Sequence, residues 1–260
     1  MSAEELLPQQ RQGLILERLL AQGRVLAVDL ARELEVSHDT IRRDLREMAA
    51  AGMCQRVYGG ALPLSPDHGP LARRRGLEPA RKAALARAAI ALIEPGQLLF
   101  LDAGSTNLAI AEALPADYRL TVATNAPAIA ARLAEREDLQ LIVIGGRVDP
   151  RIGASLGRAA TRDAEALRSD LYFLGVCGAD GDAGVSALDY EDAQFKQAVA
   201  AASRAVVAAV TDDKLGTAAR YPVLAADALH ALAVEHGGDA AQAEAFARRG
   251  VRVLRAAPSR

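Results

Sequence analysis

Cysteine, lysine, asparagine and long apolar runs are all scarce in this sequence of 260 residues. The two cysteines, Cys54 and Cys177, are too few for a disulfide framework and lack the spacing of a zinc site. No apolar run approaches the ~20 residues that cross a membrane, and the first residues include Glu4 and Glu5 in place of the basic start of a signal peptide. These absences favour a soluble cytoplasmic protein with no metal, no cofactor and no membrane partner.

The net charge is also small. Against 31 Lys plus Arg stand 33 Asp plus Glu, which gives a formal charge of −2. Residues 1–62 are near neutral as well, with 8 Arg against 9 Asp and Glu. The amount of basic charge therefore does not indicate a nucleic-acid partner, and any argument for one must come from where the charges lie.

Lysine occurs only at Lys82, Lys196 and Lys214, and asparagine only at Asn107 and Asn125. Codon bias with chance survivors explains this scarcity as well as selection does. It therefore only marks these five side chains as candidates for chemistry that Arg or Asp does not supply.

Residues 8–62 show the periodicity of three short helices followed by a small hairpin. Helices are expected over residues 8–22 and 29–34. A third begins after Ser37, a residue suited to capping a helix, and carries apolar residues at i, i+4 and i+7. These are Ile41, Leu45 and Met48. The run 55–60 indicates a strand that enters a tight turn, and the whole order predicts a winged helix-turn-helix domain.

The outward side of the third helix carries basic and hydrogen-bonding side chains. A helix N-terminus and nearby hydroxyls can bind a DNA phosphate, and arginine can bind guanine through two hydrogen bonds. The wing would add contacts to the DNA backbone or the minor groove. For any single amphipathic helix, a solvated face with local ion pairs is the plain alternative. The candidate DNA-binding residues are Ser37, His38, Asp39, Thr40, Arg42, Arg43, Arg46, Arg56 and Tyr58.

Residues 37–45 have the sequence Ser-His-Asp-Thr-Ile-Arg-Arg-Asp-Leu, and residues 56–61 have the sequence Arg-Val-Tyr-Gly-Gly-Ala. These two strings resemble the recognition-helix and wing signatures of the DeoR family of bacterial sugar-metabolism regulators. The resemblance implies that residues 37–43 begin the helix that reads DNA. It also implies that the partner is double-stranded operator DNA and that repression is the usual outcome.

Residues 63–78 have no apolar periodicity and contain three prolines and the run Arg73-Arg74-Arg75, which predicts a linker. Residues 79–257 alternate between helices and short apolar strands, which indicates a mostly parallel α/β sheet covered on both faces. Strands are expected over 98–102, 120–125, 139–145, 171–177, 205–211, 228–234 and 251–254. Helices are expected over 79–93, from 106, and over 126–136, 157–168, 190–202 and 239–249.

The turn after the first of these strands has the composition of a phosphate loop. It contains Asp102, Gly104, Ser105, Thr106 and Asn107, and a glycine, two hydroxyls and a helix N-terminus together suit an anion. An ordinary strand-to-helix turn with a hydroxyl cap is the simpler alternative. Ligands of parallel sheets bind outside the carboxyl ends of the strands, so small or polar residues at three other strand ends extend the candidate pocket. They are Thr124, Asn125, Gly145, Gly146, Gly178 and Asp180.

Further candidates lie at the start of the next helix and after the next strand. They are Glu191, Lys196, Asp212 and Lys214. The C-terminal domain of the DeoR family is similar in fold to ribose-5-phosphate isomerase, which implies a phosphorylated sugar or related metabolite as effector. The lysines would then contact phosphate or hydroxyls, with surface ion pairs as the alternative. The sequence departs from the family at 211–214 and 233–236, so the identity of the effector stays open.

Three functions fit these observations. The first is a ligand-controlled regulator, which binds DNA as at least a homodimer because two copies read two half-sites. The second is a sugar-phosphate isomerase with an accessory N-terminal domain, in which Asp180 and Lys196 would act as acid and base. The third is a DNA-binding scaffold whose C-terminal domain only oligomerises. The helix and wing signatures favour the first, a regulator and not an enzyme.

Overall fold

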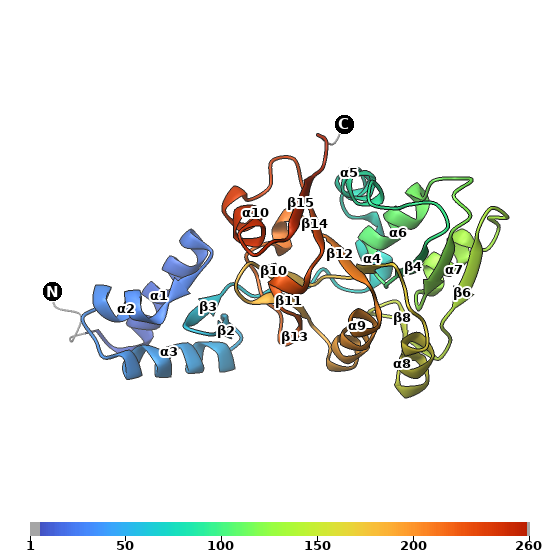
Figure 1. Ribbon diagram of the computed structural model, residues 1–260. Helices are drawn as coiled ribbons and strands as arrows, with labels where there is room; N and C mark the ends of the chain where they lie inside the picture. The colour runs from blue at the N-terminus through green and yellow to red at the C-terminus, as the bar shows by residue number, and fades with distance from the viewer. Residues whose placement is uncertain (1–5, 259–260) are drawn as a thin grey trace.

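The computed structural model describes residues 6–258, which form two parts joined by residues 63–78 (Figure 1). The N-terminal part is a three-helix unit with a small antiparallel sheet in the order β1-β3-β2. Its elements are α1 (Pro8–Gln22), β1 (Val25–Leu26), α2 (Ala27–Glu33), α3 (His38–Ala50), β2 (Gln55–Val57) and β3 (Gly60–Leu62). The expected winged helix-turn-helix is confirmed, with the wing formed by β2, β3 and the turn between them.

Helix α3 begins as its sequence predicts. Ser37 caps it by accepting a hydrogen bond from the backbone N–H of Thr40 at 3.1 Å. The apolar stripe at i, i+4 and i+7 is buried, and it packs against α1 through Ile15 and Leu19. This packing fixes which side of α3 faces solvent.

A buried ion pair also fastens α3 to α1. The guanidinium of Arg11 donates from Nε to Asp44 Oδ2 at 2.5 Å and from Nη2 to Asp44 Oδ1 at 3.0 Å. Arg11 is 5% exposed and Asp44 is fully buried. Such a pair is stable only while both charges are present, because removing one leaves the other buried without a counter-ion.

The C-terminal part contains a seven-stranded parallel sheet in the order β15-β14-β12-β9-β4-β5-β6. Helices α5 and α6 lie on one side of this sheet, and α8 and α9 lie on the other (Figure 1). The strands are β4 (Leu98–Leu101), β5 (Thr121–Thr124), β6 (Gln140–Val143), β9 (Leu171–Leu174), β12 (Ala205–Ala209), β14 (Ala231–Val234) and β15 (Arg252–Arg255). The helices are α5 (Pro79–Ile90), α6 (Ser105–Ala113), α7 (Pro127–Leu133), α8 (Arg158–Glu165), α9 (Tyr190–Ala202) and α10 (Ala240–Ala247).

The order of the strands places a topological switch point between β4 and β9. The chain proceeds outward from β4 through β5 to β6, and then returns to place β9 on the other side of β4. The connections that leave β4 and β9 therefore diverge, which opens a crevice at the carboxyl ends of these two strands. Gly175 follows β9 there, and a Cβ on it would lie 2.4 Å from Ala103 O. The close approach of the segments that follow β4 and β9 therefore requires glycine at position 175.

Two small antiparallel sheets depart from the expected alternation of strands and helices. One is the hairpin of β7 (Arg147–Asp149) and β8 (Ala154–Leu156). The other has the order β10-β11-β13, formed by β10 (Gly178–Asp180), β11 (Gly184–Ala187) and β13 (Tyr221–Leu224). Residues 178–180 are therefore a separate antiparallel strand and not the end of a parallel one.

The segment 63–78 is more ordered than its composition indicates. It contains helix α4 (Leu71–Gly76), whose last carbonyls receive the buried ammonium of Lys82: Nζ donates to Arg74 O at 2.6 Å and to Leu77 O. Leu71 packs against Gly153, where a Cβ would lie 2.1 Å from Leu71 Cδ2. The linker is thus fastened to the C-terminal domain along much of its length.

The Arg11–Asp44 pair gives a stability prediction. Asp44→Ala leaves a guanidinium buried without its partner and should lower the free energy of unfolding of the N-terminal domain by about 3–5 kcal/mol. Urea unfolding followed by circular dichroism measures the change. The double variant Arg11→Met with Asp44→Leu should recover most of it, because both buried charges are then absent. An unfolding midpoint of Asp44→Ala equal to that of the wild type would contradict the assignment.

Candidate functional site: a basic helix face and a cavity at the switch point

The exposed face of α3 gathers the basic residues expected from its sequence. Arg42, Arg43 and Arg46 are exposed and share a shallow depression with Ser37, Asp39 and Thr40. Arg42 is only loosely paired, with Nη1 3.7 Å from Asp39 Oδ1 and 65% of its side chain exposed. The guanidinium groups are therefore available to an external partner.

The wing continues this face. His38 and Arg42 of α3 border an open groove together with Arg56 of β2 and Tyr58 at the turn of the wing. Tyr58 is fully exposed, so its ring packs on none of the other described residues. An exposed helix N-terminus, a row of arginines and an unpacked aromatic side chain form a surface suited to the phosphates and base edges of duplex DNA.

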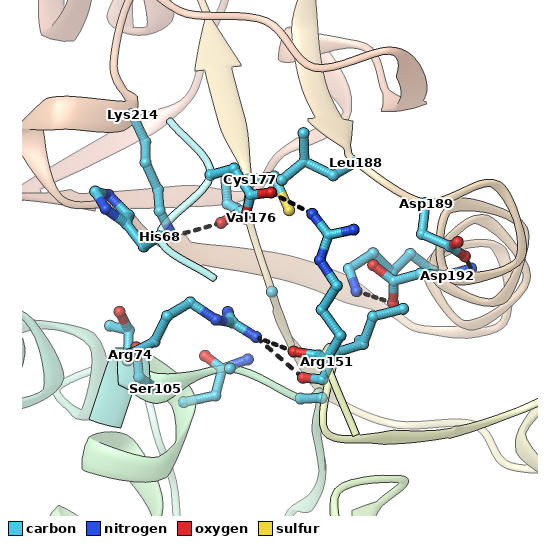
Figure 2. Close-up of a pocket in the computed structure, with 18 of the residues that line it drawn as sticks. His68, Arg74, Ser105, Arg151, Val176, Cys177, Leu188, Asp189, Asp192 and Lys214 are labelled. Carbon is cyan, nitrogen blue, oxygen red and sulfur yellow. Dashed lines mark hydrogen bonds and ion pairs between the residues drawn. The ribbon is translucent and has the colours of Figure 1, made fainter. Parts of the chain in front are cut away.

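A cavity of about 170 Å³ lies at the switch point, at the carboxyl ends of β4 and β9. Its walls come from segments far apart in the sequence: the linker, the start of α6, the turn between β7 and β8, the residues after β9, and the start of α9 (Figure 2). Lys214 and His68 lie at one side of the cavity, and Asp189 and Asp192 lie at the other. The cavity therefore has a cationic side and an acidic side.

The start of α6 forms one wall. Its N-cap is Gly104, which offers no side chain to the first backbone N–H groups of the helix. Residues 104–107 all line the cavity. Asn107 holds the turn in place, because its Nδ2 donates to Asp102 O at 3.0 Å and to Phe173 O at 2.8 Å and so bridges β4 and β9. Free N–H groups at the positive end of a helix form a site for an anion.

A buried charge cluster supports this wall. The ammonium of Lys196 lies 3.0 Å from Asp102 Oδ2 and also pairs with Asp192, and all three side chains are buried. Asp102 accepts further hydrogen bonds from Gly175 N at 2.9 Å and from the hydroxyl of Tyr172 at 3.1 Å. The cluster ties the end of β4 to β9 and α9.

The charges in the cluster perturb one another. Burial disfavours the charge of Lys196, but the two carboxylates outweigh it and raise the pKa of the ammonium. Burial, with the nearby charge of Asp102, raises the pKa of Asp192. Burial also raises the pKa of Tyr172 well above its ordinary value. The two carboxylates therefore favour the charged form of the Lys196 ammonium.

Among the described residues, Lys214 and Arg74 are the cations lining the cavity that have no carboxylate partner. The Nζ of Lys214 donates to Val176 O at 2.8 Å, and burial lowers the pKa of this ammonium. Arg74 of α4 also faces the cavity, but its Nη2 donates to the carbonyls of Arg151 at 3.3 Å and Ile152 at 3.1 Å. A half-buried ammonium with a neutral partner leaves positive charge for an incoming anion to neutralise.

The structure brings together part of the candidate set. Gly104, Ser105, Thr106, Asn107, Lys196 and Lys214 line the cavity, and Asp102 lies directly beneath it. The remaining candidates lie outside it because their side chains are engaged elsewhere or their backbone takes another path. Thr124 donates a hydrogen bond to Leu101 O, and Asn125 donates one to Ser155 O. Glu191 pairs with Arg147, and Asp212 accepts a hydrogen bond from Asp239 N. Gly145 and Gly146 precede β7, and Gly178 belongs to β10.

Asp180 departs furthest from its expected role. It accepts from Gln242 Nε2 at 3.0 Å and from the backbone of Asp182 and Ala183, and its Oδ1 lies 3.9 Å from Arg24 Nη1. Arg24 belongs to the N-terminal domain and also pairs with Asp182. The carboxylate therefore stabilises a turn at the contact between the two domains, because β10 carries it away from the parallel sheet.

Several residues of the cavity were absent from the sequence-based set. They come from the linker, the β7–β8 turn and the start of α9: Asp67, His68, Arg74, Asp149, Arg151, Asp189 and Asp192. The arginine run at 73–75 and the turn composition of Asp149-Pro150-Arg151 were the available signals. Neither shows that the segment folds over the end of a distant strand.

Among residues 6–258, no three His, Cys, Asp or Glu side chains lie close enough together to hold a metal ion. Within the same residues, every helix is too short or too polar to cross a bilayer.

Comparison with known families matches both parts of the chain. Residues 11–66 match the DeoR-like helix-turn-helix domain, and residues 78–236 match the DeoR C terminal sensor domain. A solved ribose 5-phosphate isomerase A from Methanocaldococcus jannaschii is 14% identical, with a TM-score of 0.36, over 52% of this chain and 53% of that one. Similarity at that level carries no argument about activity.

Named relatives agree with the family match. The glycerol-3-phosphate regulon repressor of Escherichia coli K12 is 35% identical over 80% of this chain and 82% of its own length. The putative aga operon transcriptional repressor of Escherichia coli O157:H7 is 28% identical over 94% and 93%. Both of these relatives are named as repressors, which favours the regulator over the isomerase. This chain belongs to the DeoR family and is a DNA-binding transcriptional regulator with a small-molecule sensor domain.

Proposed function

We propose that this protein is a repressor of an operon for sugar or polyol metabolism. A phosphorylated metabolite bound in the switch-point cavity changes its affinity for operator DNA. The uncapped N-terminus of α6 lines the same cavity as the half-buried ammonium of Lys214, and this is the observation that carries the proposal. The N-terminus and the lysine supply hydrogen-bond donors and positive charge for a phosphate. The acidic side of the cavity, with Asp189 and Asp192, supplies acceptors for hydroxyl groups.

The proposal extends to the assembly and the place of action. Each chain carries one winged helix, so we propose a homodimer or larger homo-oligomer that reads two half-sites of an operator. The proposed place of action is the cytoplasm, where operator DNA and phosphorylated metabolites meet. The names of relatives support repression, since several are called repressors.

The direct test combines DNA binding with a ligand panel. Fluorescence anisotropy would measure binding to the DNA upstream of the protein's own gene at fixed salt, since phosphate contacts make the affinity depend on salt. Glycerol 3-phosphate and hexose and pentose phosphates would be titrated, each beside its unphosphorylated counterpart. We expect one phosphate ester to change the DNA affinity while its counterpart does not. An unchanged affinity across the panel would refute the proposed effector class.

The arginines of α3 should carry DNA specificity. Arg43→Ala should weaken binding to the specific site by about tenfold or more, because a guanidinium that binds a base contributes ~1–3 kcal/mol. The same variant should bind the phosphate ester as the wild type does, since Arg43 lies far from the cavity. The control is Arg162→Ala, which removes an exposed arginine from α8 of the sensor domain. Equal DNA affinities of the two variants would exclude Arg43 from the interface.

Lys214 should carry ligand affinity. Lys214→Met keeps the aliphatic bulk but removes the ammonium, and should weaken binding of the phosphate ester by about tenfold, the value of a charged hydrogen bond of ~1.5 kcal/mol. Calorimetric titration measures this change. Specific DNA binding without ligand should persist, which shows that the variant is folded. Unchanged ligand affinity would remove Lys214 from the site.

A further inference from the structure

Two segments meet over the cavity through opposite charges. The linker contributes Asp67, and the turn between β7 and β8 contributes Arg151, whose guanidinium pairs with the Asp67 carboxylate. Figure 2 shows Arg151 extending across the cavity. Both side chains are largely exposed, at 62% for Arg151 and 46% for Asp67. This pair joins the only segment that leads to the DNA-binding domain with the wall of the ligand cavity.

The neighbouring carboxylate of Asp149 does not pair with the Arg151 guanidinium in the described structure. Asp149 accepts from the backbone N–H groups of Arg151 at 2.8 Å and Ile152 at 3.1 Å and so shapes the turn. Asp67 itself accepts from Gly69 N at 2.9 Å, and this bond, with the charge of Arg151, lowers the pKa of its carboxyl group. Among the described residues, Asp67 is the one acidic group that pairs with Arg151.

The rest of the linker is held by contacts that do not involve Asp67 or the Arg151 guanidinium. Leu71 N donates to Arg151 O at 2.9 Å, and Ser65 Oγ donates to Cys177 O at 2.5 Å. His68 pairs with Asp213 at 2.7 Å. Breaking the Asp67–Arg151 pair would therefore release the Asp67 side chain from the β7–β8 turn, while the His68 contact and α4 stay in place.

We propose that Arg151 is an anion-binding residue of the sensor cavity and that Asp67 occupies it in the absence of ligand. The inference rests on the proposed phosphate site. A bound phosphate displaces the Asp67 carboxylate from the Arg151 guanidinium, because a dianion forms stronger bidentate hydrogen bonds with arginine than a solvated carboxylate does. The Asp67 side chain is then released from the β7–β8 turn, and ligand and DNA affinities become coupled through the linker.

The exposure of the Asp67 and Arg151 side chains limits how strongly their pairing can weaken ligand binding. A surface ion pair changes an equilibrium by about fivefold or less, so Asp67 weakens ligand binding without preventing it. Asp67→Asn keeps the shape of the side chain but removes its charge. The variant should therefore bind inorganic phosphate about three- to fivefold more tightly than the wild type.

A double-mutant cycle separates this competition from a general loss of negative charge. Phosphate binding to the full chain would be measured by calorimetry at constant ionic strength for wild type, Asp67→Asn, Arg151→Gln and the double variant. Arg151→Gln should bind phosphate about tenfold more weakly. In the Arg151→Gln background, Asp67→Asn should add no affinity, because no guanidinium remains to be released. The same gain in both backgrounds would overturn the proposal.

A matched control and a DNA readout complete the test. Glu112→Gln removes an acid of similar exposure that pairs with Arg132 on the sensor surface, outside the residues of the cavity, and should leave phosphate affinity unchanged. The DNA affinity of Asp67→Asn without phosphate should move toward that of the phosphate-saturated wild type. An Asp67→Asn variant identical to Glu112→Gln in both readouts would overturn the inference and leave the phosphate site intact. Absence of phosphate binding to the wild type would refute both.

Discussion

The ammonium of Lys196 is the interaction on which the sensor domain depends. It neutralises Asp102 at the end of β4 and Asp192 at the start of α9, where all three side chains are buried. β4 and β9 are parallel neighbours, but the connections that leave them diverge and open a crevice at their carboxyl ends. The cluster, with the Asn107 amide that bridges both strands, ties the walls of this crevice together. The cavity is thus a consequence of topology that one buried cation stabilises.

Much of the architecture followed from local patterns. Apolar periods of 3.6 predicted α1 and α3, and continuous apolar runs predicted the parallel strands, because burial on one or both faces imposes those patterns. The strands end earlier than their apolar runs: β9 stops at Leu174, where 171–177 was expected. The residues that follow leave the ladder to form the cavity wall, and apolar composition alone does not mark that change.

The parts of the site that were missed depend on long-range packing. Ser105 and Thr106 were predictable because a strand, a glycine turn and a helix start are adjacent in sequence. Arg151 and Asp67 were not, because only the folded hairpin brings residue 151 against the linker. Asp180 shows the converse: its Gly-Ala-Asp string suggested a ligand carboxylate, but its position in β10 turns it toward Arg24 of the other domain. Sequence encodes local turns more directly than the meeting of distant turns.

The two domains are connected by the Arg24 contact and by the linker, and these two connections differ in whether ligand binding can act on them. The contact of Arg24 with Asp180 and Asp182 lies outside the cavity, so a ligand there has no direct means of favouring one state of it. The linker instead contributes Asp67 and Arg74 to the cavity and continues into β3 of the winged helix. A ligand shifts an equilibrium only by its difference in affinity for the two states. The linker is therefore the joint through which binding energy can reach the DNA-binding face, and the Arg24 contact sets the arrangement from which that change departs.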